Sequence, residues 1–143
     1  MKAAATKRLV LDASVALAWC FEDETNAFSE LILDIVGAGA QSHVPAIWPF
    51  EVANALLVAE RRKRVTTAQV TALLERIAKL AIVVEPISAG RAFSPILAVA
   101  RQLQLTEYEA AYLELALREA LPIATLDTKL RRAAHSAGVE LVE

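Results

Sequence analysis

Apolar positions along this chain form two patterns: short unbroken runs, and longer stretches in which they recur every three or four residues. The short runs are typical of buried β-strands, and the longer stretches are typical of amphipathic helices. Strands are predicted over residues 8–11, 42–44, 82–84, 123–126 and 139–142. Helices are predicted over residues 14–21, 25–36, 49–63, 67–80, 90–103, 106–120 and 127–137. Because helices separate the strands, we expect a three-layer α/β/α fold with a central, mostly parallel sheet of about five short strands.

Capping residues and prolines refine these elements. Thr66 and Gln69 resemble a capping box at the start of the fourth predicted helix. Pro95 lies inside the fifth predicted helix and is expected to make it irregular. The sequence has no linker, repeat or low-complexity tract, so a single domain over residues 1–143 is expected.

Composition and charge limit the classes of partner. Apolar residues make up 56% of the 143-residue chain, which predicts a buried core. The formal net charge is -2, so no overall basic field attracts nucleic acid or an anionic membrane. A polyanionic substrate would therefore need local basic residues or a bound metal.

The N-terminal region and the single cysteine indicate the compartment. The apolar stretch that follows Arg8 is broken by Asp12 and again by Glu22, so neither a signal peptide nor a membrane span is expected. Cys20 is the only cysteine, which rules out an intrachain disulfide and fits a reducing cytosol. A cytoplasmic, soluble protein is expected.

Four acidic residues, far apart in sequence, occupy positions that an open α/β sheet would bring together. Asp12 and Asp127 each follow a predicted strand, and the carboxyl ends of parallel strands are where such folds build their sites. Glu51 lies early in the third predicted helix, and Glu109 lies in the first turn of the sixth. Carboxylates in one pocket repel one another, and a divalent cation is the usual reason to tolerate this.

Each acid also has a purely structural interpretation. Asp12 and Asp127 could be helix N-caps, each worth about 1 kcal/mol. Glu51 is favourably placed in a first helical turn, although a polar partner on the same face, three residues on, suggests a site. That partner is Asn54. Glu109 completes a T-x-x-E capping box, and the residues alone favour this capping role.

Other reactive residues point to no alternative centre. His43 and His135 lack partners at zinc spacing, so both are expected to be surface or loop residues. The sequence contains neither a G-x-G-x-x-G motif nor a Walker A loop, which disfavours a dinucleotide or P-loop site. The basic run 61–64 is interpreted as a solvated helix end. Three basic residues close to Asp127 could contact a phosphate backbone. These are Lys129, Arg131 and Arg132.

Four segments, taken in order, resemble the motifs of PIN-domain ribonucleases, specifically the VapC-like toxins of toxin–antitoxin pairs. The segments are 11–15, 50–56, 105–116 and 123–130. They read LDASV, FEVANAL, LTEYEAAYLELA and IATLDTKL, and the resemblance spans nearly the whole chain.

The resemblance implies which residues form the site. The acidic quartet that binds Mg²⁺, or Mn²⁺ in its place, would be Asp12, Glu51, Glu109 and Asp127. Supporting polar residues would be Ser14, Asn54 and Thr125. The third acidic position is usually aspartate in this family, and glutamate here moves the carboxylate outward by about 1.5 Å. Metal affinity and occupancy of a second metal site are therefore open.

The function implied by this resemblance is a metal-dependent endoribonuclease toxin. It would cut single-stranded or looped RNA, form a homodimer, and be neutralised by a VapB-like antitoxin. The alternative is a non-catalytic PIN-like module that binds RNA or antitoxin. A metal-dependent DNA nuclease is disfavoured because the chain lacks the long insertions of such relatives.

Overall fold

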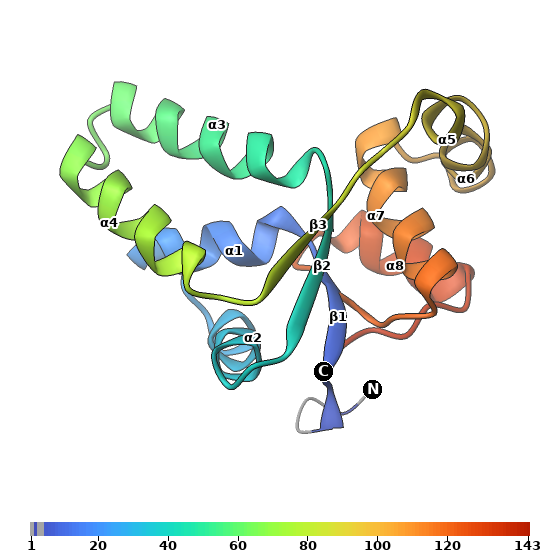
Figure 1. Cartoon of the computed structure of the whole chain (residues 1–143), viewed down its shortest axis with the longest axis horizontal. Coiled ribbons are helices and arrows are strands. Elements are labelled where there is room, and N and C mark those ends of the chain that lie inside the picture. Colours follow the sequence, from blue (N-terminus) through green and yellow to red (C-terminus); the bar gives the residue numbers. More distant parts are fainter. Residues whose placement is uncertain (1, 3–4) are drawn as a thin grey trace.

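A parallel β-sheet runs through the centre of the computed structural model, which describes residue 2 and residues 5–143 (Figure 1). Its strands are β1 (Arg8–Leu11), β2 (Gln41–Pro45), β3 (Ile82–Glu85) and β4 (Ile123–Ala124). They are arranged in the order β3-β2-β1-β4, and every neighbouring pair is parallel. The middle of β1 is paired on both sides, since Val10 lies beside His43 of β2 and Ile123 of β4.

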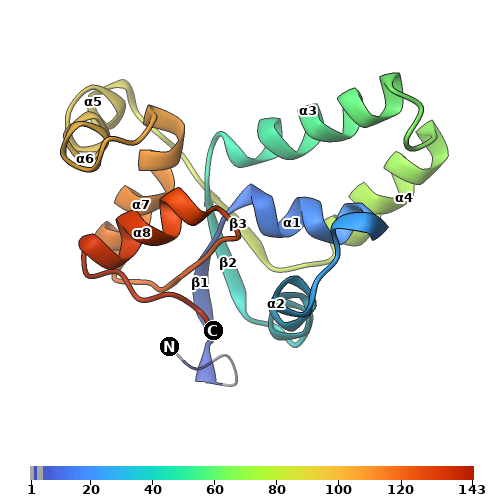
Figure 2. The same cartoon turned by 180° about the vertical axis from the view of Figure 1, so that it is seen from behind.

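Helices cover both faces of this sheet. They are α1 (Ala13–Cys20), η2 (Glu22–Glu24), α2 (Ala27–Gly37), α3 (Trp48–Arg61), α4 (Thr67–Ala78), α5 (Ala89–Phe93), α6 (Pro95–Leu103), α7 (Glu107–Glu119) and α8 (Thr128–Ser136). Figures 1 and 2 show α1 to α4 on one side of the sheet and α5 to α8 on the other. The predicted three-layer α/β/α arrangement is confirmed. Among the described residues, no helix is both long and apolar enough to cross a membrane.

The C-terminal part of the sheet is shorter than the apolar runs predicted. β4 ends at Ala124 because the next backbone groups bond to side chains rather than to a strand. The N–H of Leu126 donates to Ser14 Oγ at 3.0 Å, and that of Asp127 donates to Thr125 Oγ1 at 3.0 Å. The predicted last strand is reduced to one bridge between Leu141 and β4. The sheet therefore has four strands and this bridge.

The helix that was expected to be irregular at Pro95 is divided in two. Ser94 separates α5 from α6 with backbone angles of φ -129° and ψ -83°, outside the helical region. Proline disfavours helical geometry in the residue before it and is itself well suited to a first helical turn, where no N–H is needed. Pro95 therefore ends one helix and begins the next.

The core lies between β1 and the helices on both of its sides. Leu9, Val10 and Leu11 of β1 are fully buried. In α7, every residue from Ala110 to Ala116 is buried, so this helix has no solvated face over two turns. Burying one large apolar side chain stabilises the fold by about 1.5–3 kcal/mol. This packing holds the start of α7 close to the carboxyl end of β1.

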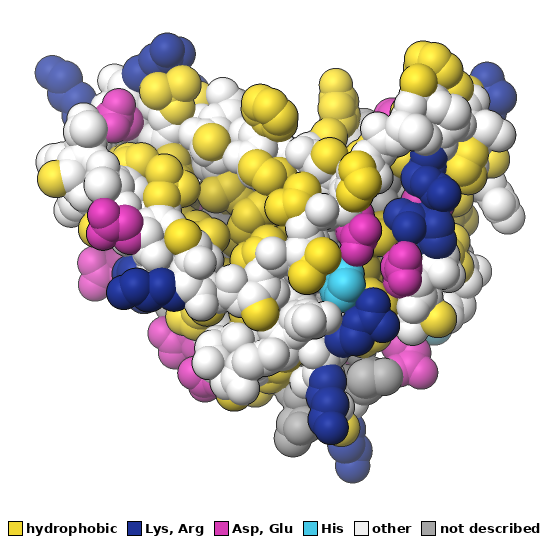
Figure 3. Space-filling view, in the orientation of Figure 1, with side chains coloured by type: hydrophobic (Ala, Val, Ile, Leu, Met, Phe, Trp, Pro, Cys, Tyr) yellow, Lys and Arg dark blue, Asp and Glu magenta, His cyan; other side chains and the backbone are white. Residues whose placement is uncertain are grey.

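Apolar and basic side chains are distributed differently over the surface. Figure 3 shows exposed apolar side chains gathered between α3 and α4 and along the outer strand β3. The exposed large apolar residues of these three elements are Phe50 and Leu57 of α3, Leu74 of α4 and Val84 of β3. Lys and Arg side chains lie in separate groups on the same face, in keeping with the net charge of -2.

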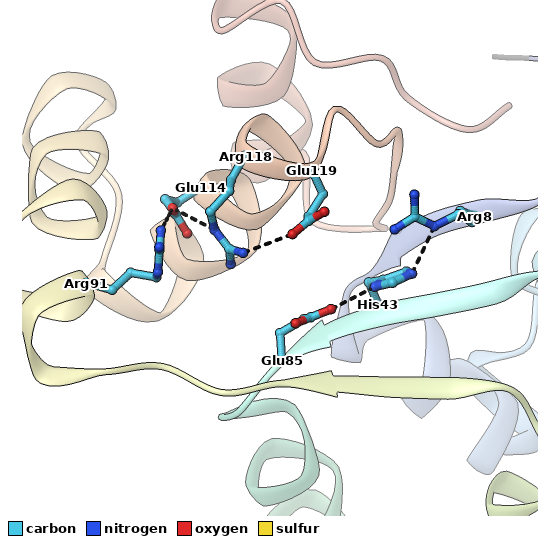
Figure 4. A network of polar contacts seen from close by, with 7 residues as sticks. All are labelled: Arg8, His43, Glu85, Arg91, Glu114, Arg118 and Glu119. Atoms are coloured by element: carbon cyan, nitrogen blue, oxygen red, sulfur yellow. Dashed lines mark hydrogen bonds and ion pairs between the residues drawn. The ribbon is translucent and has the colours of Figure 1, made fainter.

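A buried histidine links three strands, contrary to the prediction that His43 lies at the surface or in a loop (Figure 4). The Arg8 Nε–H donates to His43 Nε2 at 3.2 Å, and Glu85 Oε1 lies 3.0 Å from His43 Nδ1. Since arginine can only donate, Nε2 must accept and Nδ1 carries the proton that is donated to Glu85. That prediction failed because it rested on the lack of metal-binding partners at zinc spacing, which carries no information on whether a histidine packs in the core. His135, by contrast, is exposed on α8.

A second polar network ties α5 to α7. Glu114 is buried on α7, and its Oε1 accepts hydrogen bonds from Arg91 Nη1 at 2.6 Å and Arg118 Nε at 3.2 Å (Figure 4). Arg118 also donates to Glu119. Two arginines on one buried carboxylate satisfy its charge, as burial of an ionised group requires.

Candidate functional site

All four predicted acidic residues line one hollow of about 350 Å³, above the carboxyl ends of β1 and β4. Asp12 follows β1 directly, and Asp127 lies three residues after β4. Glu51 comes from the first turn of α3 and Glu109 from the first turn of α7. The two helices lie on opposite sides of the sheet and meet above its edge (Figures 1 and 2). Residues 115 positions apart are therefore neighbours in space.

The Asp12 side chain lines the hollow and does not cap a helix. It occupies the N-cap position of α1, but its side chain makes no capping bond. Its Oδ2 instead accepts hydrogen bonds from Ser14 Oγ and Thr125 Oγ1, each at 2.7 Å. Burial raises the pKa of Asp12, and the nearby Asp127 charge adds to this, while the two hydroxyls oppose it. The side-chain capping interpretation of Asp12 is wrong.

Two hydroxyl groups join the ends of β1 and β4. Ser14 Oγ donates to Asp12 and accepts from the Leu126 N–H, and Thr125 Oγ1 donates to Asp12 and accepts from the Asp127 N–H. Each hydroxyl thus uses its proton on the carboxylate and a lone pair on the backbone. The supporting positions expected for Ser14 and Thr125 agree with these contacts.

Asp127 combines capping with its place at the hollow. Its Oδ1 accepts from the Leu130 N–H at 2.9 Å and so caps α8. The expected capping role is confirmed. The cap fixes the orientation of the carboxylate at the edge of the hollow, next to Asp12.

Glu51 is half-buried and is held by a residue that the sequence did not single out. The hydroxyl of Tyr112 donates to Glu51 Oε1 at 2.6 Å. Burial raises the pKa of Glu51, the Tyr112 hydrogen bond opposes this, and the Asp12 charge adds to it. Tyr112 lies within the buried stretch of α7. The available signal was its hydroxyl, because a buried tyrosine usually finds a polar partner.

Glu109 forms the capping box that the sequence predicted. Its Oε1 accepts from the Thr106 N–H at 2.9 Å, and its own N–H donates to Thr106 Oγ1 at 3.1 Å. Lys129 Nζ lies 3.6 Å from the same oxygen. Burial favours a higher pKa for Glu109, but the Thr106 bonds and the Lys129 charge outweigh it and lower the pKa. The surroundings of Glu109 therefore favour its ionised form, whereas burial opposes ionisation of Asp12 and Glu51.

The other predicted polar residues differ in their relation to the hollow. Asn54 is exposed on α3 and does not line it. Arg131 donates from Nη1 to the Thr125 carbonyl at 2.9 Å and lies over the Phe28 ring, 5.6 Å from its centroid. Arg131 therefore supports the strand end, whereas Arg132 is exposed on α8.

The basic run 61–64 is at the opposite end of α3 from Glu51. Arg64 donates to Asp23 and lies over the Phe21 ring, 4.4 Å from its centroid. The remaining cations of the run are exposed. This placement agrees with the interpretation of the run as a solvated helix end.

The donor set fits a hydrated divalent cation. Across residue 2 and residues 5–143, no three Asp, Glu, His or Cys side chains converge as direct ligands of one metal ion. Mg²⁺ does not require such a cage, because it usually keeps several waters and is held by one or two carboxylates together with substrate phosphate. Burial is the main cause that raises the pKa of Asp12 and of Glu51, and a neighbouring carboxylate adds to each shift, Asp127 for Asp12 and Asp12 for Glu51. A bound cation would stabilise these charges.

Comparisons with known proteins show a family by sequence and a similar fold by structure. The sequence profile of the PIN domain matches residues 9–136. The structure is similar to the crystal structure of PAE2754 from Pyrobaculum aerophilum, with a TM-score of 0.68 and 22% sequence identity, over 90% of this chain and 80% of that chain. At this identity the likeness shows the fold. A search of curated proteins found no match.

Proposed function

Because this chain belongs to the PIN domain family, we propose that it is a metal-dependent endoribonuclease that acts as the toxin of a toxin–antitoxin pair. PIN domains are generally metal-dependent nucleases and usually bind divalent metals. The observation that carries the proposal is the presence of four acidic residues around one hollow, drawn from both helical layers and two strand ends.

In this proposal the acids share the binding of one Mg²⁺ or Mn²⁺. Asp12 and Glu51 would be direct ligands of this hydrated ion, and Asp127 and Glu109 would act on it through its bound waters. A bound cation of this kind activates water and neutralises charge on a phosphodiester. Ser14 and Thr125 hold Asp12 in place, so that the carboxylate is oriented before the metal arrives.

RNA is the proposed substrate, bound as a single strand or loop. An acidic hollow repels a phosphate backbone until a cation is present, so RNA binding would depend on the metal. Lys129 lies beside the hollow, since its Nζ is 3.6 Å from Glu109 Oε1 and its side chain is 57% exposed, and Arg132 is exposed on the same helix. Both could contact flanking phosphates. A single strand allows its phosphodiester to bend into a hollow, which a duplex resists.

Protein partners are proposed on the basis of exposed apolar groups and the family resemblance. Phe50 is 80% exposed and Phe93 is 76% exposed, and aromatic side chains are enriched where proteins contact one another. The proposed partners are a second copy of this chain, giving a homodimer, and a VapB-like antitoxin. A cytoplasmic location follows from an RNA substrate and an antitoxin encoded with the toxin.

Cleavage of RNA with a matched variant tests the proposal. Wild-type protein should cut single-stranded RNA with Mn²⁺ or Mg²⁺, and EDTA should abolish the activity. Asp12→Asn keeps the shape of the side chain and removes its charge, so it should lower the rate on the order of 100-fold or more. Equal rates for Asp12→Asn and wild type would show that the proposed site is wrong. Parallel digestion of single-stranded DNA separates the RNase from a DNase.

A non-catalytic PIN-like module that binds RNA or antitoxin is the second candidate. The observation in its favour is that Glu109 is already engaged by Thr106 and Lys129. A protein of this kind would bind no Mn²⁺ at millimolar concentration in calorimetry. It would still bind its partner in the presence of EDTA.

A further inference from the structure

One hydrogen bond connects the two helical layers directly above the carboxyl edge of the sheet. Tyr112 of α7 donates its hydroxyl proton to Glu51 Oε1 of α3 at 2.6 Å, across 61 positions of sequence. The short distance is typical of a bond from a hydroxyl to an ionised carboxylate. Tyr112 is 2% exposed and still lines the hollow, so its ring is in the core and its hydroxyl is at the site.

We propose that Tyr112 is a positioning residue, whose hydroxyl fixes the Glu51 carboxylate in the orientation that binds the cation. The inference rests on the metal site proposed above and goes beyond the acidic quartet. A glutamate has several rotatable bonds, and its head group would otherwise be free to turn toward solvent. The tyrosine has two, and its ring is locked by the surrounding core.

The geometry leaves Glu51 able to act as a ligand. An ionised carboxylate offers about four lone-pair positions, and the Tyr112 hydroxyl uses one of them on Oε1. Oε2 and the remaining positions of Oε1 are left for a cation. The bond therefore orders the ligand in advance without replacing it, which is how supporting groups around metal sites raise affinity.

The Asp12 carboxylate is also oriented by hydrogen bonds from hydroxyl groups. Ser14 and Thr125 donate to Asp12 as Tyr112 donates to Glu51. The two acids whose pKa burial raises are thus the two that receive hydroxyl donors. Hydroxyls suit this purpose because they supply a hydrogen bond without a positive charge that would compete with the metal.

A double-mutant cycle measured by Mn²⁺ calorimetry tests the inference. Tyr112→Phe keeps the buried ring and removes only the hydroxyl, and should weaken Mn²⁺ binding by about 10-fold or more. Glu51→Gln should weaken it as well. Adding Tyr112→Phe to Glu51→Gln should then have little further effect, because the hydroxyl acts through the Glu51 carboxylate.

Tyr108→Phe is the matched control. Tyr108 lines the same hollow but is 65% exposed, and its loss of a hydroxyl should leave Mn²⁺ affinity unchanged. Thermal unfolding of the metal-free variants reports separately on packing, which a merely structural role of Tyr112 would alter without changing the affinity.

The outcomes separate this inference from the proposed function. If wild-type protein binds Mn²⁺ and Tyr112→Phe binds it equally well, Tyr112 has no positioning role and the metal site stands. An equal loss from Tyr112→Phe in the Glu51→Gln background would show that the hydroxyl does not act through Glu51, which also overturns the inference. If wild-type protein binds no Mn²⁺, the metal site itself is wrong.

Discussion

Ionisation of Asp12 carries a cost to the folded state. Burial raises its pKa above the ordinary 3.8, so over a range above that value the folded protein retains a proton that the unfolded chain has lost. The corresponding stability is full below pH 3.8 and is lost as pH rises through the folded-state pKa. Glu51 has a shift of the same sign. At neutral pH both carboxylates therefore destabilise the metal-free fold.

This gives a prediction for the metal-free protein. Asp12→Asn should be more stable than wild type at pH 7–8 in EDTA, because it removes a buried charge while an amide oxygen can still accept from Ser14 and Thr125. The advantage should shrink toward pH 4, as the wild-type carboxyl takes up its proton. Denaturant unfolding at several pH values measures it. If Asp12→Asn is less stable than wild type throughout this pH range, the predicted direction of the change in unfolding free energy is wrong.

Glu109 should matter less for the metal than Asp12, because one of its oxygens already serves Thr106 and lies near Lys129. Glu109→Gln retains a capping side chain and should lower Mn²⁺ affinity by less than about 10-fold, against about 100-fold for Asp12→Asn. Glu109→Asp shortens the reach to the backbone and should cost about 1 kcal/mol of unfolding free energy. Calorimetry and denaturation measure the two effects separately. A loss of affinity equal to that of Asp12→Asn would make Glu109 a full ligand.

At the scale of single residues, the sequence predicted interactions between neighbours along the chain better than contacts between residues far apart in sequence. The capping box of Thr106 and Glu109 was readable because its spacing is local. The Tyr112 bond to Glu51 was not readable, since it spans 61 positions and depends on how α3 and α7 pack. His43 was misplaced for the same reason.

At the scale of elements, the His43 link supports the three strands that it joins. His43→Phe should lower the unfolding free energy by about 1–3 kcal/mol, because it removes the two hydrogen bonds that His43 makes with Arg8 and Glu85. His135→Phe, at an exposed position of α8, is the control and should change stability by about 0.5 kcal/mol or less. Denaturant unfolding compares them. Similar effects from both substitutions would mean that the link contributes little.

The apolar pattern predicted the existence and type of these elements but not all of their ends. α3 and α7 lie within two residues of their predicted bounds, because capping and proline signals are local. β4 lost two predicted residues to hydroxyl groups from Ser14 and Thr125. The last predicted strand forms only one β-bridge, because an apolar run does not by itself provide a neighbouring strand with which to pair.

At the scale of the whole molecule, strand order creates the site. β1 and β4 are neighbours in the sheet, so the residues that follow them, Asp12 and Asp127, meet at one edge. Periodicity predicts strands and helices but not this order. The positions of Asp12 and Asp127 after strands predicted that they lie at one edge of the sheet. The family resemblance was needed to place Glu109 in the site. That residues 1–143 form one domain stays a prediction.

The proposed cation centre is tested most directly by titrating Mn²⁺ into wild-type protein and Asp12→Asn in a calorimeter. The wild type should bind Mn²⁺ with a dissociation constant below about 1 mM, equivalent to about 4 kcal/mol of binding free energy. Asp12→Asn should bind on the order of 100-fold more weakly, while its circular dichroism shows the same fold. No heat from the wild type at millimolar Mn²⁺, or equal binding by the two proteins, would contradict a metal centre built on Asp12.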